Sequence, residues 1–253
     1  MLKLNKVSKS YTDRDGKRNS VLRELDFEIK AGEMVSFLGE SGSGKTTLLK
    51  VIASLLKVDE GSVEFSEGKK PKLGYMFQTP TLLPWKSVLE NVQLPIRKQN
   101  DVSNDKAMNC LKRVGLEKFK NYLPNQLSGG MKARACLAQI LFLEPDLFMM
   151  DEPFSSLDEI HRNKMNEDFI RIWESTKSSA IFVTHNIGEA VFMSDRVIIV
   201  SQDTHKKSII AEVAVKFARP RIPELRRTHE FNELVENIRD ILREAILHGV
   251  DNQ

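Results

Sequence analysis

The chain has few cysteines and no long apolar run, and each shortage excludes a class of protein. Its 253 residues include only Cys110 and Cys136, which lack metal-ligand spacing, so we expect two reduced structural thiols rather than a disulfide framework or a zinc site. The longest apolar stretches, such as residues 147–150 and 197–200, are far shorter than the roughly 18 residues that cross a bilayer. Any membrane role is therefore expected to be peripheral.

A strong excess of charge is also lacking. The 38 basic and 35 acidic side chains leave a net charge of +3, which is too small to indicate a nucleic-acid partner. Residues 1–6 lack the apolar core of a signal peptide, so we expect a cytoplasmic chain. Hydrophobic residues make up 41% of the sequence, which is enough for the core of a folded protein.

Apolar segments of strand length alternate with segments of helical period, which predicts an α/β fold with a mainly parallel sheet. The expected strands and helices, in chain order, are residues 33–38, 46–56, 147–150, 160–173 and 180–184. Short alternating segments also occur at residues 2–4, 25–29 and 63–65. Because turn-forming residues separate them, they predict an additional antiparallel β-layer.

Two regions differ from this α/β pattern. Prolines bracket helix-forming sequence at residues 105–114, so we expect an inserted helical lobe at residues 80–125, with the core at residues 1–79 and 126–218. Residues 219–253 are expected to form a C-terminal tail with an amphipathic helix, whose apolar face is Phe231, Leu234, Val235, Ile238, Ile241, Leu242, Ala245 and Ile246. Such a helix packs either on its own domain, which is the commoner case, or on a partner.

A glycine-rich segment lies between a predicted strand and a predicted helix. It reads Gly39-Glu40-Ser41-Gly42-Ser43-Gly44-Lys45-Thr46 and matches the pattern G-x-x-x-x-G-K-[ST]. The glycines allow the backbone to curl with its N–H groups toward phosphate oxygens. Lys45 is expected to contact the β- and γ-phosphates, and Thr46 to place its hydroxyl on Mg²⁺. The sequence therefore predicts a P-loop NTPase core that binds a nucleoside triphosphate and its metal.

Two adjacent carboxylates, Asp151 and Glu152, end the apolar segment at residues 147–150. The ends of parallel strands are where α/β sheets place ligand chemistry. We expect Asp151 to hold the Mg²⁺ shell and Glu152 to polarise the water that attacks the γ-phosphate. In isolation such a pair is typical of a surface turn, so this interpretation depends on the phosphate loop.

The segment Leu127-Ser128-Gly129-Gly130-Met131 precedes these acids and resembles the signature motif of the ABC ATPase family. The resemblance extends over about residues 2–201 and implies the ABC ATPase fold, with ATP and Mg²⁺ as cofactors. It further implies that Tyr11 stacks on adenine, that Gln78 contacts metal and water, and that His185 is the switch histidine. The nucleotide-binding residues that it implies beyond the phosphate loop are Thr47, Ser128, Gly129, Gly130 and Asp158.

The chemistry of several of these residues fits the implied roles. Ser128, Gly129 and Gly130 precede a stretch of helical period, so they present backbone N–H groups to an anion. Since one chain already has one such site, this second one makes sense if it closes on ATP held by a second copy, in a head-to-tail dimer. A plain helix cap is the alternative. His185 follows a predicted strand, where it is placed to contact the γ-phosphate, although a lone histidine is usually structural. Tyr11 is also typical of an exposed hairpin residue.

Residues 78–95 and 184–196 are similar to the nitrate/sulfonate/taurine class of importers, a class that also includes importers of pyrimidine precursors of thiamine. The resemblance implies an integral-membrane permease as partner, a solute-binding protein as indirect partner, and a peripheral location on the cytoplasmic face of the membrane. Leu82, Leu83 and Trp85 suit a surface that receives the permease, although they also suit anchoring of the helical lobe.

The chain departs from the family pattern at Ala133, Gln139 and Asn186, the last standing where aspartate usually follows the histidine. Two other functions compete with import. A soluble ABC-type ATPase that acts on nucleic acid or ribosomes usually has a long coiled-coil insertion or two cassettes, and neither is found here. An export or lipid-transport motor shares every catalytic residue, and only the resemblance of residues 78–95 argues against it.

Overall fold

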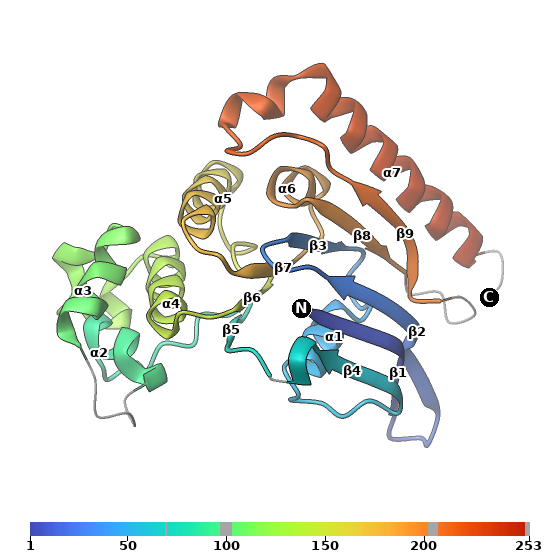
Figure 1. Ribbon diagram of the computed structural model, residues 1–253, viewed down its shortest axis with the longest axis horizontal. Coiled ribbons are helices and arrows are strands. Elements are labelled where there is room, and N and C mark those ends of the chain that lie inside the picture. The colour runs from blue at the N-terminus through green and yellow to red at the C-terminus, as the bar shows by residue number, and fades with distance from the viewer. Residues whose placement is uncertain (69, 97–102, 202–206, 251–253) are drawn as a thin grey trace. The chain divides into compact units, whose positions relative to one another are not determined.

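The computed structural model describes residues 1–68, 70–96, 103–201 and 207–250 (Figure 1). The chain divides into two compact units. The first unit comprises Met1–Lys70 and Ser179–Gln253, and the second comprises Pro71–Ser178. Among the described residues, no helix is both long and apolar enough to cross a membrane.

The first unit contains the predicted antiparallel layer. Strand β1 (Leu2–Thr12) lies between β2 (Arg18–Ile29) and β4 (Glu60–Phe65) and pairs antiparallel with both. Leu2 lies opposite Ile29 on one side and Phe65 on the other, and it is fully buried. The strands are longer than the apolar segments predicted, because backbone pairing continues through polar residues that face solvent.

The first unit also contains parallel strands. Strand β3 (Met34–Leu38) lies between β7 (Ser179–Thr184) and β8 (Arg196–Val200), and β9 (Ile209–Ala214) pairs antiparallel with β8. Every residue of β3 is buried, as expected for a parallel strand covered on both faces. The predicted strands at residues 33–38 and 180–184 are therefore confirmed.

The α-helices among the described residues of this unit are α1 (Lys45–Ile52), α6 (Ile187–Met193) and α7 (His229–Val250). Helix α1 ends four residues before the predicted end at residue 56. Ser54 adopts a left-handed conformation with φ of 61°, and the Lys50 carbonyl accepts hydrogen bonds from both Leu55 N and Leu56 N. This cap ends the helix, and Leu55 is left 62% exposed instead of lying on a helical apolar face.

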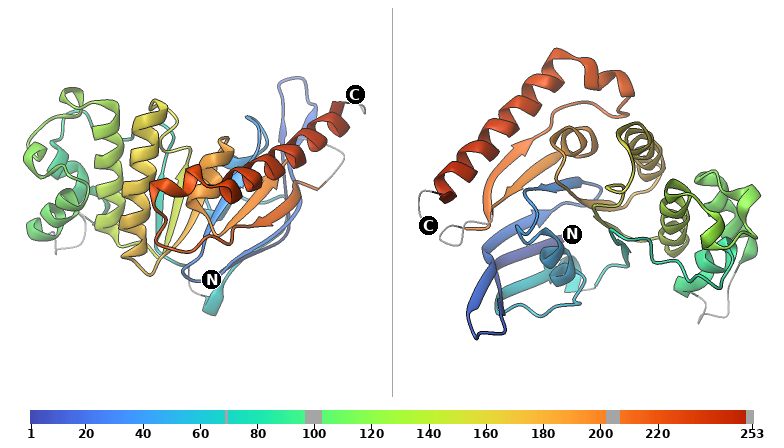
Figure 2. Two further views of the ribbon diagram at one scale, coloured as in Figure 1. Left: turned by 90° about the horizontal axis from the view of Figure 1, so that it is seen from above. Right: turned by 180° about the vertical axis from the view of Figure 1, so that it is seen from behind.

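Helix α7 is the predicted C-terminal amphipathic helix. Its apolar face includes Phe231 and Ile238, which are 4% and 0% exposed, and the helix packs on α6 and β9 of its own unit (Figure 2). Of the two alternatives left open by the sequence, packing on its own domain is the one observed. A short 3₁₀ helix, Pro223–Arg227, leads into it.

The second unit contains parallel strands β5 (Leu73–Met76) and β6 (Leu147–Asp151). Helix α4 (Gly129–Leu143) contacts β5, and α2 (Val88–Gln93) and α3 (Asn104–Arg113) pack on α4. Helix α5 (Glu159–Glu174) completes the unit. Strand β6, α3 and α5 confirm the elements predicted at residues 147–150, 105–114 and 160–173. The separate helical lobe at residues 80–125 and the boundaries of the core and tail stay predictions.

Candidate functional site

The phosphate loop connects β3 to α1, and its glycines occupy positions that other residues do not fit. Gly42 and Gly44 have φ angles of 87° and 88°. A Cβ atom at Gly39 would lie 2.4 Å from the Val200 carbonyl oxygen, and one at Gly44 would lie 2.7 Å from the Val21 carbonyl oxygen. Any other residue would therefore strain the backbone at Gly42 and Gly44, or press on the neighbouring strand backbone at Gly39 and Gly44.

Lys45 holds the loop closed. Its side chain is 5% exposed, and its Nζ donates to Gly39 O at 2.8 Å, Glu40 O at 2.6 Å and Ser43 Oγ at 3.2 Å. The loop residues that face solvent are Glu40, Ser41, Gly42 and Thr46. Thr46 and Thr47 lie in the first turn of α1, directly after Lys45. A cradle of amides and one cation suits a polyphosphate.

Strand register brings His185 to the same sheet edge as the loop. Leu38 at the end of β3 lies opposite Thr184 at the end of β7, and the two strands are parallel. Gly39 and His185 therefore both follow the carboxyl ends of neighbouring strands. Their roles toward a nucleotide stay predictions. His185 is exposed.

The backbone on both sides of His185 is fixed by a helix cap. The Thr184 hydroxyl accepts a hydrogen bond from Asn186 N at 3.0 Å and donates to the buried Glu189 carboxylate. Asn186 Oδ1 accepts from Glu189 N at 2.9 Å, which makes Asn186 the N-cap of α6. Asparagine and aspartate cap helices about equally well, so Asn186 preserves the helix start despite departing from the family pattern.

Tyr11 lies near the end of β1 and is 43% exposed. It pairs with Asn19 of β2, two residues before Val21, whose carbonyl oxygen lies against Gly44. Strand β2 thus connects the position of Tyr11 to the phosphate loop. An exposed aromatic ring in this neighbourhood has the chemistry needed to stack on a base.

The second unit holds the acidic residues. Asp151 ends β6 and is 5% exposed, and its Oδ2 accepts a hydrogen bond from the Tyr75 hydroxyl at 3.1 Å. Burial, together with the negative charge of Asp151, raises the pKa of Tyr75 well above its ordinary value, so the phenol stays a donor. Tyr75 was not predicted from the sequence. No motif marks this residue. Its contact with Asp151 follows from the strand register, in which Tyr75 of β5 lies opposite Met149 of β6, two residues before Asp151.

Glu152 and Gln78 lie together in the second unit. Gln78 Nε2 donates to Glu152 Oε2 at 3.4 Å, a long hydrogen bond. Glu152 has φ of 46°, a left-handed backbone that is strained for a residue with a side chain. Strained residues of this kind cluster at functional sites. The left-handed backbone at Glu152 ends the extended conformation that continues through Asp151. The structure thus brings together two of the three residues predicted to be catalytic within one unit.

The remaining predicted residues lie at two helix starts of the second unit. Ser128 caps α4, and its Oγ accepts from Met131 N at 3.3 Å. A Cβ atom at Gly129 or Gly130 would meet only Leu157 Cδ2, at 3.8 Å and 3.9 Å, which is ordinary contact. Packing within this chain therefore does not require either glycine. Asp158 caps α5 by accepting from His161 N at 3.1 Å, and this hydrogen bond lowers its pKa.

Comparisons with known proteins agree with this geometry. A family model described as "ABC transporter" matches residues 22–155. The chain is 36% identical over 258 residues to an uncharacterized ABC transporter ATP-binding protein of Methanocaldococcus jannaschii, covering 98% of this chain and 94% of that protein. It is 34% identical over 265 residues to the taurine import ATP-binding protein of Rhizobium johnstonii, covering 100% and 98%.

A solved structure is also similar. The dimeric post-hydrolysis state of an ATP-binding cassette bound to ADP and Pi matches with a TM-score of 0.76 and 31% identity, covering 86% of this chain and all of that one. The predicted ABC ATPase fold and the resemblance to the nitrate/sulfonate/taurine class are therefore confirmed. The matching family model and these two relatives show that the chain belongs to the ABC transporter family of ATPases.

Proposed function

We propose that this chain is the ATP-hydrolysing subunit of an ABC importer. One observation carries the proposal: a phosphate loop closed around Lys45 lies at the same sheet edge as the exposed His185. The taurine import ATP-binding protein, similar over its whole length, supports import rather than export. The chemistry is the attack of water on the γ-phosphate of ATP, which yields ADP and phosphate.

Each predicted residue has a part in that reaction. The loop amides and Lys45 bind the phosphates, and Tyr11 stacks on the adenine. Mg²⁺, when bound, neutralises charge on the β- and γ-phosphates, and Thr46, Asp151 and Gln78 would hold it with phosphate oxygens and water. An Mg²⁺ site of this kind needs only one or two protein carboxylates, and Asp151 at the end of β6 would supply one.

Proton transfer falls to Glu152. Its carboxylate accepts the proton of the attacking water as the oxygen bonds to phosphorus and the bond to ADP breaks. Gln78, hydrogen-bonded to Glu152, orients the same water. His185 donates to the γ-phosphate and stabilises the charge that develops on it.

A second copy of the chain completes the site. We propose that Ser128, Gly129 and Gly130 bind the γ-phosphate of ATP held by the partner copy in a head-to-tail dimer. The two glycines are not needed for packing within this chain, which supports close approach of a ligand from outside it. Asp158, the N-cap of α5, would lie in the loop between the two active sites of that dimer.

The partners beyond the dimer are a permease in the membrane and, through it, a solute-binding protein. Trp85 is 72% exposed, and with Leu82 and Leu83 it offers an apolar surface to the permease. The chain would then lie peripherally on the cytoplasmic face of the membrane. A small solute of the nitrate, sulfonate, taurine or pyrimidine-precursor type is the cargo class that the resemblance favours.

Hydrolysis by the Glu152→Gln variant tests the chemistry. Removal of a general base costs about a hundred- to ten-thousandfold in kcat, so ATP should be bound but not turned over. Glu117→Gln is the matched control, because Glu117 is an exposed glutamate on a 3₁₀ turn of the same unit. Near-normal turnover by Glu152→Gln would refute the assignment of the base.

Affinity purification of the tagged chain from its native membranes tests the transport role. Recovery of a polytopic permease supports import, and the solute-binding protein encoded beside it is then screened for its ligand. Recovery with ribosomes or nucleic acid, without a permease, would leave the ATPase chemistry standing and refute the importer.

A further inference from the structure

The segment that follows β9 carries two arginines, Arg219 and Arg221, which we call the arginine arm. Its guanidinium groups bind the last carbonyls of α6. Arg221 Nη1 donates to Val191 O and Phe192 O, both at 2.9 Å, and Arg219 Nη2 donates to Met193 O at 2.9 Å. Three successive carbonyls at the end of one short helix are thus held by the arm.

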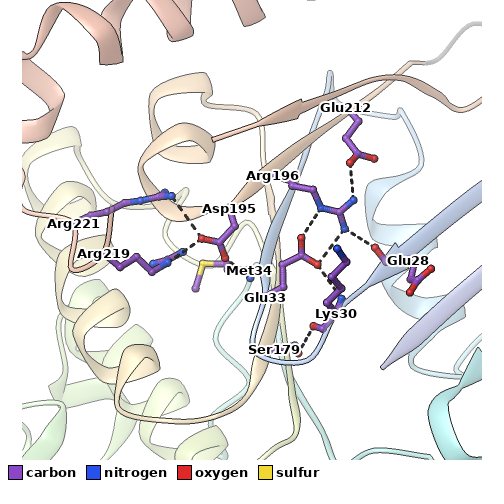
Figure 3. Close-up of polar contacts among 10 residues, drawn as sticks. All are labelled: Glu28, Lys30, Glu33, Met34, Ser179, Asp195, Arg196, Glu212, Arg219 and Arg221. Atoms are coloured by element: carbon purple, nitrogen blue, oxygen red, sulfur yellow. Dashed lines mark hydrogen bonds and ion pairs between the residues drawn. The ribbon is translucent and has the colours of Figure 1, made fainter. Parts of the chain in front are cut away.

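The arm is itself anchored to the strand that leads into the phosphate loop. Arg219 Nε donates to Asp195 Oδ1 at 3.0 Å, and Arg221 Nη2 lies 3.7 Å from the same oxygen. The other oxygen of Asp195 accepts from Met34 N at 2.9 Å. Because Met34 is the first residue of β3, one carboxylate joins the arm, the end of α6 and the start of β3, as Figure 3 shows.

Helix α6 carries this constraint to His185. The helix has seven residues, so it is about 10 Å long and moves as a rigid unit. It lies on β3, and its first residue follows Asn186, whose cap fixes the backbone next to His185. A shift at the end of α6 therefore shifts His185 relative to the phosphate loop at the far end of β3.

Simple capping does not account for the arm. Ser194 Oγ already donates to the Ala190 carbonyl at 2.7 Å, which shows that small side chains satisfy helix ends in this chain. The Arg221 side chain is instead fully buried, and burial of a guanidinium is costly unless its geometry is specific. A third arginine, Arg226, also contacts α6, with its guanidinium 3.4 Å from the centre of the Phe192 ring.

We infer that Arg219 and Arg221 are positioning residues for His185 in ATP hydrolysis. They set the end of α6 against β3, and the helix places the histidine at the γ-phosphate. The C-terminal tail thereby contributes to catalysis without contact with the nucleotide. The inference rests on the proposed role of His185, so its test needs one measurement that is independent of that role.

That measurement is the ¹³C–¹H resonance of the His185 imidazole in the full-length chain with labelled histidine, assigned by its loss in His185→Gln. The variants are Arg221→Met and Arg221→Lys, with Arg219→Gln as the milder change, because Arg219 is only partly buried. Arg196→Met is the matched control. Arg196 binds Glu33, Glu212 and the Glu28 carbonyl, none of which lies in α6 (Figure 3).

The arm variants should move the His185 resonance, and the control should not. Their kcat for ATP should fall about tenfold, since a misplacement of about 1 Å costs up to about a hundredfold. The KM for ATP should change by less than about twofold. In a His185→Ala background, Arg221→Met should cause no further loss of kcat, because the two residues act through one group.

The outcomes separate the two hypotheses. An unmoved His185 resonance in folded Arg221→Lys and Arg219→Gln would overturn the positioning role, as would an unchanged kcat in both. Full hydrolysis by His185→Ala would instead overturn the proposed function of the histidine, and the resonance shift would still decide whether the arm positions it.

Discussion

The sharpest test of the phosphate loop is the substitution Gly44→Ala, compared with Gly16→Ala. Both glycines have left-handed backbones, with φ of 88° and 82°. A Cβ atom at Gly16 would have nothing within 4 Å, whereas one at Gly44 would lie 2.7 Å from Val21 O and 3.0 Å from Leu22 Cδ2. The two variants therefore share the conformational cost and differ only in the surroundings.

The magnitudes follow from these distances. A left-handed backbone costs an alanine about 1–2 kcal/mol, which is the whole effect expected at Gly16. Overpacking adds about 1–3 kcal/mol at Gly44, because the nearest atom is strand backbone rather than the end of a flexible side chain. The free energy of unfolding should thus fall by about 2–5 kcal/mol in Gly44→Ala.

Nucleotide binding should separate the variants further. If β2 and the loop move apart to accept the new methyl group, the loop amides no longer converge on the phosphates, and ATP affinity falls. Urea unfolding gives the stability, and calorimetric titration with ATP and Mg²⁺ gives the affinity, with Gly16→Ala expected to bind as the natural chain does. The reasoning fails if Gly44→Ala is as stable as Gly16→Ala and binds ATP equally well.

Two further predictions concern single hydrogen bonds in the second unit. The pKa of Tyr75 is raised, so the folded chain keeps its proton above pH 10 while the unfolded chain loses it, and stability should fall as pH rises above that value. Tyr75→Phe should lose less free energy of unfolding between about pH 9 and pH 11 than the natural chain, and an equal loss would contradict the cause given. Ser87 forms a capping box with Glu90 at the start of α2, so Ser87→Ala should cost about 1 kcal/mol and lower the Tm by about 2–4 °C in a thermal scan. An unchanged Tm would show that the cap contributes nothing.

Motifs and periodicity predicted the elements whose cause is local. The strand at residues 34–38 is buried on both faces, and such strands are continuous apolar runs that the sequence displays directly. The tight phosphate loop was predictable because glycine readily adopts the left-handed backbone found at Gly42 and Gly44. Helix α7 was visible from the spacing of its apolar residues alone.

Features that depend on distant partners were not predictable. Apolar residues at Leu55 and Leu56 continue the helical period of α1, yet Ser54 ends the helix because Lys50 O accepts the next two amides. Tyr75 became a partner of Asp151, 76 residues later in the sequence, only through the register of strands β5 and β6. Arginines are mostly exposed, and the burial of Arg221 follows from contacts with residues about 30 positions earlier.

The departure at Asn186 shows how structure changes the weight of a sequence difference. In the family an aspartate usually follows the histidine, so asparagine removes a negative charge beside His185. The cap is unaffected, since Asn186 Oδ1 accepts from Glu189 N as a carboxylate oxygen would. The buried Glu189 side chain lies at the same helix start and accepts a hydrogen bond from the Thr184 hydroxyl. The substitution therefore leaves the position of His185 intact and alters only its electrostatic surroundings, which is why it does not weaken the assignment of this histidine to the γ-phosphate.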